Sequence, residues 1–371
     1  MIPWLDPALT WKEHISHAAR KGLAASKALA RLATSTWGPS ARHSRLLYTA
    51  VVRPTLLYGA QEWRMRGDGK PLAPAIASPL HKVQNECLRK VTGAYRRTPR
   101  AAIERETAVM PIDLYMEVSG YQHANRTKEH LVESQIANAA DKVWRHMRRA
   151  REPQPRPPTN RESVASQTTK RIQEMREWIE ESRPRGRPAG SAHTHRRRAT
   201  GAPQTPSEAS YIKRWGELTW QRRWEAAVQR LPSRRPAAVW RTPWAQDPRR
   251  LYAGLSKAEA TALFLMRTEV IGLNAWLAAI QVLEVTPACP CGWHAQTVRH
   301  ILLHYPRYNR VDLLSACGTE RLDDILMRPE SAKHAARWLV RAGVLEQFRV
   351  AAEMAEEEIE GYRPFQTAEE W

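Results

Sequence analysis

The stretch that decides the fold covers residues 10–36 and reads TWKEHISHAARKGLAASKALARLATST. Its apolar residues recur at every third or fourth position, which is the period of a helix with one buried face. Thr10 and Glu13 have the spacing of a capping box, in which two side chains satisfy free backbone amides of the first turn. Gly38 and Pro39 end the pattern. We therefore expect one long helix here.

The helical period continues beyond this stretch. Ser40 is placed to cap a second helix, which we expect to stop before Pro54 because proline lacks an amide hydrogen and clashes with the preceding turn. A loop rich in Gly and Pro covers 66–77, and Ser78-Pro79 then begins a third helix. Further along, Ser256 and Glu259 form another capping box.

The chain divides into segments of different composition. Residues 152–206 are rich in Pro, Arg, Ser, Thr and Gly, and we read them as a disordered basic linker because they bury too little apolar surface to offset chain entropy. Alternating strand patterns and internal repeats are missing from the sequence. We expect a mainly α protein with a first helical segment over 1–66, a helical extension over 78–151, the linker, and a helical C-terminal region over 207–371.

The charge of the chain favours a polyanionic partner. Lys and Arg number 58 against 38 Asp and Glu, a formal net charge of +20. Each phosphate that such a chain neutralises releases a condensed counterion, so RNA or DNA is the expected partner, ahead of an anionic membrane surface. Four cysteines are too few for a disulfide framework, and we find neither a secretory signal nor an apolar run that could span a bilayer. We expect an intracellular, nuclear protein; the sequence carries no indication of oligomeric state.

Two motifs near the start of the chain resemble a known family. They are Ser35-Thr36-Trp37-Gly38-Pro39-Ser40 and the run LYTAVVRPTLLYGAQEW over 47–63. Together with Leu5-Asp6-Pro7 they resemble the segment that follows the catalytic palm in reverse transcriptases of fungal non-LTR (LINE-like) retrotransposons. The match begins almost at Met1, so we expect the palm to be absent from this chain.

The resemblance implies that the first helices form a thumb, which grips a template–primer duplex through its backbone. Such recognition needs shape and positive charge more than base reading. The alternative is an ordinary solvated helix face. The cations that we expect to contact nucleic acid are Lys12, Arg20, Lys21, Lys27, Arg31, Arg42, Arg45 and Arg53.

A Cys/His loop over 289–306 is the sharpest candidate for a metal site. Cys289 and Cys291 flank a proline, and His300 and His304 follow at a spacing that places both on one face of a helix. Thiolate and imidazole ligands suit Zn²⁺, which prefers four in a tetrahedron. The loop resembles the zinc-binding module found C-terminal to many non-LTR reverse transcriptases.

One position departs from that module. Tyr305 stands where the family has its last cysteine, and a phenol is a poor zinc ligand. His304 is the substitute that we expect, and His294 is a further candidate. The alternative is a decayed site in which the two cysteines are buried thiols. No catalytic zinc is implied, because nothing nearby suggests an activated water with a general base.

The expected linker contains Arg183-Pro184-Arg185-Gly186-Arg187-Pro188, which looks like the core of an AT-hook. Extended arginines suit the narrow minor groove of A·T-rich DNA, so we include the three arginines among the candidate nucleic-acid contacts. A stretch of this composition also generates such a motif by chance. The other interpretation is a non-specific electrostatic contact with nucleic acid.

Polymerase chemistry needs carboxylates that hold two Mg²⁺ ions. We find no Asp-Asp pair in a strand–turn–strand context, since Asp323-Asp324 lies in a helical pattern. We therefore assign no catalytic residue, expect Mg²⁺ only in the intact parent enzyme, and predict an inactive fragment of a reverse transcriptase that retains at most RNA or DNA binding. The alternatives are a repurposed chromatin or DNA-binding protein that uses the AT-hook-like motif, and a decayed reading frame without function.

Overall fold

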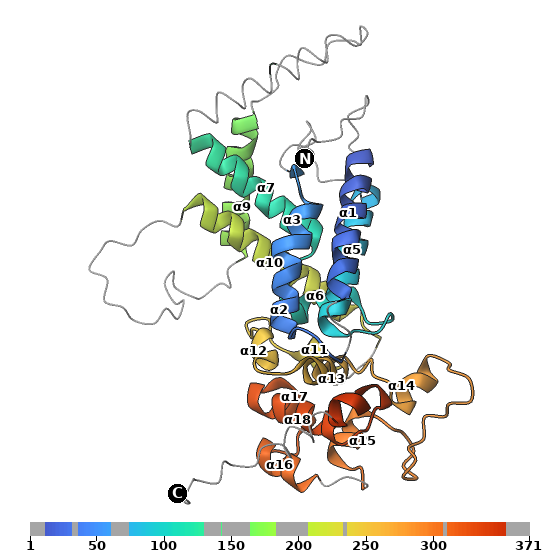
Figure 1. The fold of residues 1–371 in the computed structure, drawn as a ribbon. Coiled ribbons are helices and arrows are strands. Elements are labelled where there is room, and N and C mark those ends of the chain that lie inside the picture. Colours follow the sequence, from blue (N-terminus) through green and yellow to red (C-terminus); the bar gives the residue numbers. More distant parts are fainter. Residues whose placement is uncertain are drawn as a thin grey trace, which may run out of the picture. The chain divides into compact units, whose positions relative to one another are not determined.

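A computed structural model describes residues 12–31, 36–60, 74–129, 142, 164–182, 207–232, 236–306 and 310–353. In these residues helices dominate and no strand occurs, which confirms the expected mainly α class (Figure 1). No helix among them is both long and apolar enough to cross a bilayer. The chain divides into two compact units. The first takes in Met1–Tyr58, Ser78–Met110 and Trp224–Trp371, and the second Gly59–Ala77 and Pro111–Arg223.

The long helix predicted over 10–36 is present as α1 (Lys12–Ala30), with Arg31 in a turn directly after it. Thr10 of the predicted capping box lies outside the described residues. Ser40 then caps α2 (Ala41–Leu47) as predicted, since its hydroxyl accepts from the amide of His43. The helical path continues through η1, a π-helical turn over Tyr48–Val52, into α3 (Arg53–Leu56). Gly22 of α1 faces Leu56, where a Cβ would lie 2.3 Å from the leucine Cδ2 atom. The glycine therefore permits the close approach of α1 and α3.

The expectation that the second helix stops before Pro54 is wrong. The π-helical turn shifts the hydrogen-bond register, so that the amide of Arg53 donates to the carbonyl of Tyr48. Pro54 then falls in the first turn of α3, where a missing amide hydrogen costs little. The expected loop over 66–77 is also wrong at its end, because α5 (Pro74–Thr92) begins at Pro74 and contains Pro79.

Helices α5 and α6 (Arg100–Thr107) supply much of the core of the first unit. The face of α5 that carries Leu80, Val83, Cys87, Leu88 and Val91 is buried, as its spacing predicts. Gly93 ends α5 with φ +69°. That left-handed conformation suits glycine, which has no Cβ to clash with the backbone.

The C-terminal part of the first unit packs around α13 (Lys257–Thr268), which is buried along its length. The predicted capping box of Ser256 and Glu259 is confirmed at its start. The other elements of this part are α11 (Ala238–Arg241), α12 (Arg249–Tyr252), α14 (Asn274–Ala279), α15 (Val298–Leu303), α16 (Val311–Cys317), α17 (Leu322–Met327), α18 (Pro329–Arg341) and η2 (Glu346–Phe348).

A buried ion pair ties α13 to α6. The Nε and Nη2 atoms of Arg267 each lie 2.8 Å from a carboxylate oxygen of Glu106, and neither side chain is exposed. Arg267 also donates to the hydroxyl of Thr242 at 2.9 Å and to the carbonyl of Leu326. These contacts supply the hydrogen bonds that a buried charge requires.

The second unit contains α7 (Ile112–Glu129), α9 (Val164–Glu181) and the first part of α10 (Glu208–Gln229). Tyr121 of α7 meets Trp215 of α10 edge to face, with ring centroids 6.2 Å apart. The guanidinium of Arg222 lies over the ring of Trp178, 4.0 Å from its centroid. Aromatic and cation–π contacts of this kind stabilise the packing of the helices.

Helix α9 corrects the expectation of a disordered linker over 152–206. Ile172, Met175 and Ile179 recur at helical spacing and are buried in the structure. Averaged composition hid this short amphipathic pattern between two Pro- and Arg-rich stretches. Residues 152–163 and 183–206 lie outside the described residues, so the expectation is not tested there.

Candidate metal centre and cationic surface

The two candidate cysteines lie on a tight turn. The amide of Gly292 donates to the carbonyl of Cys289 at 2.9 Å, and the amide of Cys289 donates to the carbonyl of Trp293 at 2.8 Å. Gly292 has φ +89°, which lets the chain reverse directly after Cys291. The turn thereby presents both thiols from one short segment.

His300 is placed opposite this turn by α15. Thr297 caps the helix by accepting a hydrogen bond from the amide of His300 at 3.1 Å. Gln296 anchors the approach to the helix, because its amide donates to the carbonyl of Pro287 and its side chain accepts from the amide of Asn274. The cysteine turn therefore faces the first turn of α15.

The ligand atoms of Cys289, Cys291 and His300 all lie within 4.8 Å of one another. Sγ of Cys291 is 3.2 Å from Nε2 of His300. Zinc–sulfur bonds of about 2.3 Å and zinc–nitrogen bonds of about 2.0 Å, at tetrahedral angles, place ligand atoms roughly 3.5–3.8 Å apart. This group could hold a metal ion, and its thiolate–imidazole chemistry is compatible with Zn²⁺.

The surroundings of His300 favour a neutral imidazole. Burial lowers its pKa, and the nearby His304, Arg310 and His294 lower it further. A neutral ring keeps a lone pair for a metal. Its Nδ1 atom is buried and has no hydrogen-bond partner among the described residues. The residues present therefore fit a metal ion.

The structure does not bring His304 into this group. Helix α15 ends at Leu303, and His304 has φ −133°, so the helical spacing that predicts a shared face stops one residue early. His304 is exposed and its ring lies 6.2 Å from that of Trp293. Tyr305 is buried, with its ring centroid 5.5 Å from that of His300. Position 305, where the module that this loop resembles has a cysteine, thus lies beside the group of Cys289, Cys291 and His300.

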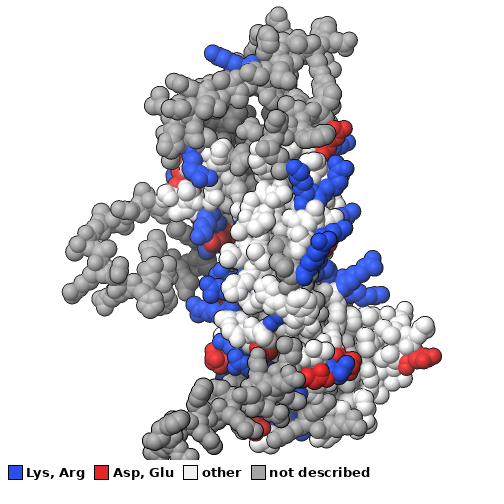
Figure 2. Space-filling view, viewed as in Figure 1, with Lys and Arg blue, Asp and Glu red and all other residues white. Residues whose placement is uncertain are grey.

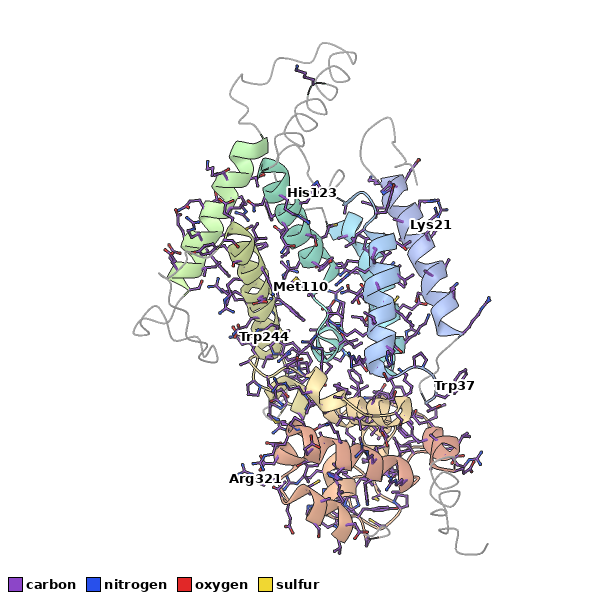
Figure 3. The ribbon with its side chains drawn as sticks, turned by 60° about the vertical axis from the view of Figure 1, so that its left-hand side comes forward. Lys21, Trp37, Met110, His123, Trp244 and Arg321 are labelled. Atoms are coloured by element: carbon purple, nitrogen blue, oxygen red, sulfur yellow. The ribbon has the colours of Figure 1, made fainter. Side chains whose placement is uncertain are left out.

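The candidate thumb residues gather on α1. Lys12, Arg20, Lys21 and Lys27 are exposed, as is Arg31 directly after the helix. Glu13 is the one acidic residue in α1. Lys and Arg side chains follow this flank in Figure 2, and Lys21 is labelled on α1 in Figure 3. Partial burial and the charges of Lys21 and Arg20 lower the pKa of His17 on the same helix.

The other predicted nucleic-acid contacts have different surroundings. Arg42 is exposed on α2, whereas Arg45 donates to the carbonyls of Thr107 and Ala108 at 2.6 and 3.0 Å and so caps the end of α6. Arg53 is half-buried in α3. The AT-hook-like arginines, Arg183, Arg185 and Arg187, lie outside the described residues.

Comparison with known protein families, with characterised proteins and with solved structures finds no match to this chain.

Neighbouring carboxylates in α17 are held by arginines. Asp323 pairs with Arg241, and Asp324 lies 3.5 Å from Arg328. Both aspartates are in a helix, as the sequence predicts, and not on a strand hairpin. This pair does not provide the carboxylate arrangement of a polymerase palm.

Sequence reasoning missed two arginines that the fold brings to a cavity. Arg249 and Arg250 of α12 join Arg42 and Arg45 of α2 around one hollow of the first unit. The two pairs are about two hundred residues apart in sequence, so neither helical period nor local spacing could have joined them. The only local signal was the run Asp247-Pro248-Arg249-Arg250.

Proposed function

We propose that this chain binds RNA or DNA through the cationic surface of α1, as the thumb-like part of a non-LTR retrotransposon reverse transcriptase. The observation that carries the proposal is the set of exposed cations on α1, namely Lys12, Arg20, Lys21 and Lys27 with Arg31 after it, beside a single acidic residue. The motifs over 35–63 support the family assignment.

The α1 surface suits contact with the phosphates of a nucleic acid and not with the edges of its bases. Arg20 and Lys27 are two turns apart on one side of the helix, with Lys21 beside Arg20. None of these three cations has an ion pair with a carboxylate in the described part of the chain. A row of free cations on a rigid helix binds a nucleic-acid backbone without reading its sequence. We therefore propose a duplex grip that depends on charge and shape.

Zinc at Cys289, Cys291 and His300 would have a structural role in this proposal. The three ligands join the cysteine turn to α15, so a bound ion would fix the loop between α14 and α15. Three protein ligands leave one coordination position for water or another group, and we expect weaker binding than at a four-ligand site. No described observation favours DNA binding through the AT-hook-like motif.

The experiment for the α1 surface compares two triple variants of equal charge change. The first carries Arg20→Gln, Lys21→Gln and Lys27→Gln. The matched control carries Arg321→Gln, Arg328→Gln and Arg349→Gln, which are also exposed but lie beside carboxylates. Figure 3 shows Lys21 and Arg321 on separate parts of the first unit.

We expect the α1 variant to bind an RNA–DNA hybrid at least tenfold more weakly than the unaltered chain, measured by fluorescence anisotropy. The control should change affinity by less than about threefold, because its arginines are already partly neutralised by Asp or Glu. Equal losses in the two variants would show that only net charge matters and would contradict a dedicated surface on α1.

A further inference from the structure

A cavity of about 330 Å³ in the first unit is lined by residues of α2, α5, α6, α12 and α13. Four of the lining side chains are arginines, Arg42, Arg45, Arg249 and Arg250, and one is a carboxylate, Glu106. Small-molecule sites in proteins occupy roughly 300–1,000 Å³, so this hollow has the size of a site for one compact ligand.

Two of the arginines already have partners in the protein. Arg249 holds both carboxylate oxygens of Asp247, with contacts of 2.7–3.0 Å. Arg45 donates to the backbone carbonyls at the end of α6. Arg42 and Arg250 are exposed, and the guanidinium group of neither makes a hydrogen bond or a close ion pair with a described residue. Arg250 bonds to Asp247 only through its backbone amide, and its charge helps to lower the pKa of that carboxylate from a greater distance. Their guanidinium groups are therefore available to an incoming anion.

The one carboxylate in the lining does not oppose an anion. Both oxygens of Glu106 are bound by Arg267 at 2.8 Å, and the hydroxyl of Tyr252 donates to one of them. Its charge is thus neutralised inside the protein. Burial lowers the pKa of Arg45, and the positive charges of Arg249 and Arg53 lower it further, which reflects the crowding of cations at this place.

The remaining lining is apolar enough to cover an uncharged ligand body. Val91 of α5, Ala260 of α13 and Ala253 after α12 line the cavity, with Tyr252 beside them. Arginine forks match phosphate oxygens, and apolar walls with an aromatic residue suit a flat ring. The lining thus combines side chains that can bind a phosphate with side chains that can cover an apolar ring.

We propose that this cavity binds a phosphate monoester carried on a flat ring system, that is, a nucleoside monophosphate unit. Arg42 and Arg250 would hold the phosphate, and the walls of α5, α12 and α13 would cover the base. The unit could come from a free mononucleotide or from the 5′-phosphorylated end of a strand. This proposal is independent of duplex binding by α1.

The test uses the full chain and isothermal titration with AMP, adenosine and inorganic phosphate. AMP should bind, adenosine should bind at least tenfold more weakly, and phosphate should compete with AMP. The variant that combines Arg42→Ala and Arg250→Ala should lose at least tenfold in AMP affinity. The matched control, Arg321→Ala with Arg328→Ala, removes two exposed arginines elsewhere and should leave AMP affinity within twofold.

Competition between AMP and short oligonucleotides identifies the source of the unit. Displacement of AMP by a 5′-phosphorylated oligonucleotide, but not by its 5′-hydroxyl counterpart, would assign the cavity to strand ends. Displacement by neither would assign it to the free nucleotide. Absence of AMP binding, or AMP binding that the Arg42 and Arg250 changes leave intact, would overturn the proposal. The triple variant of α1 should bind AMP normally, so failure here is distinguishable from failure of the proposed duplex binding.

Discussion

At the scale of single residues, the ion pair of Arg267 and Glu106 makes the clearest stability prediction. Changing Arg267 to Met alone leaves a buried carboxylate without its partner, which costs about 3–5 kcal/mol. Changing Glu106 to Leu as well removes both charges, and we expect the double variant to recover much of that loss. Urea unfolding of the four members of this double-mutant cycle measures the coupling. If the double variant lost as much unfolding free energy as the two single variants together, the predicted coupling between Arg267 and Glu106 would be contradicted.

Lys257 predicts a pH dependence. Its ammonium donates to the carbonyls of Lys90 and Val91 at 2.7 Å, and burial lowers its pKa from 10.5 to about 8. Between about pH 8 and pH 10.5 Lys257 keeps its proton in the unfolded chain but has lost it in the folded chain. The free energy of unfolding therefore rises with pH in this range. The contribution is greatest above pH 10.5 and is lost as pH falls to about 8.

The measurement is the free energy of unfolding of the unaltered chain minus that of Lys257→Met, taken at pH 7 and every half unit up to 10.5. Subtraction removes the other groups that titrate in this range. We expect a constant difference below about pH 8 and a rise of up to about 3 kcal/mol above it. A difference that falls with pH would contradict this prediction. It would mean that the hydrogen bonds to the two carbonyls stabilise the charged ammonium by more than burial destabilises it.

At the scale of elements, local signals predicted the helix starts at Ser40 and Ser256 but not the start of α5, which begins at Pro74 and not at Ser78-Pro79. Ser40 and the Ser256–Glu259 pair act through contacts within one turn, so sequence alone was sufficient to place them. The path through Pro54 was not predictable in this way, because the π-helical turn that accommodates it depends on packing. Helix α9 was missed because its apolar residues are few and its flanks are rich in Pro and Arg.

The Cys/His loop was predictable for three of its four expected ligands. The capped first turn places His300, whereas His304 depended on the helix continuing for one more residue, and α15 ends before it. Helix ends fray, and sequence alone places them only to within about one or two residues. The sequence therefore predicted that Cys289, Cys291 and His300 lie together, but it wrongly added His304 to them.

The element-scale prediction concerns this metal group. Tyr305→Cys places a thiol beside His300 and should raise zinc affinity at least tenfold by supplying a fourth ligand. Cys291→Ser should abolish tight binding, and the matched change His304→Ala should leave affinity within twofold. Competition with a chromophoric chelator gives these affinities. Zinc affinity that is indifferent to Cys291 would contradict the assignment.

At the scale of the whole molecule, sequence predicted the helical class but not the division into units. The first unit joins the N-terminal helices with the C-terminal region, whereas composition suggested contiguous segments. Contacts such as those from Arg267 to Glu106 link positions far apart in the chain, and no local pattern reports them. Arg42 and Arg250 also lie far apart in the chain, and only the folded structure brings them to one cavity.

The central claim, a nucleic-acid grip by the exposed cations of α1, is tested most directly by the salt dependence of binding. The slope of log affinity for an RNA–DNA hybrid against log salt concentration counts the phosphates neutralised by the protein. We predict a slope smaller by roughly 2–3 for the variant with Arg20, Lys21 and Lys27 changed to Gln, since each lost contact removes about 0.7–0.9. The control with Arg321, Arg328 and Arg349 changed to Gln should keep the slope of the unaltered chain. An α1 variant with an unchanged slope would contradict the claim.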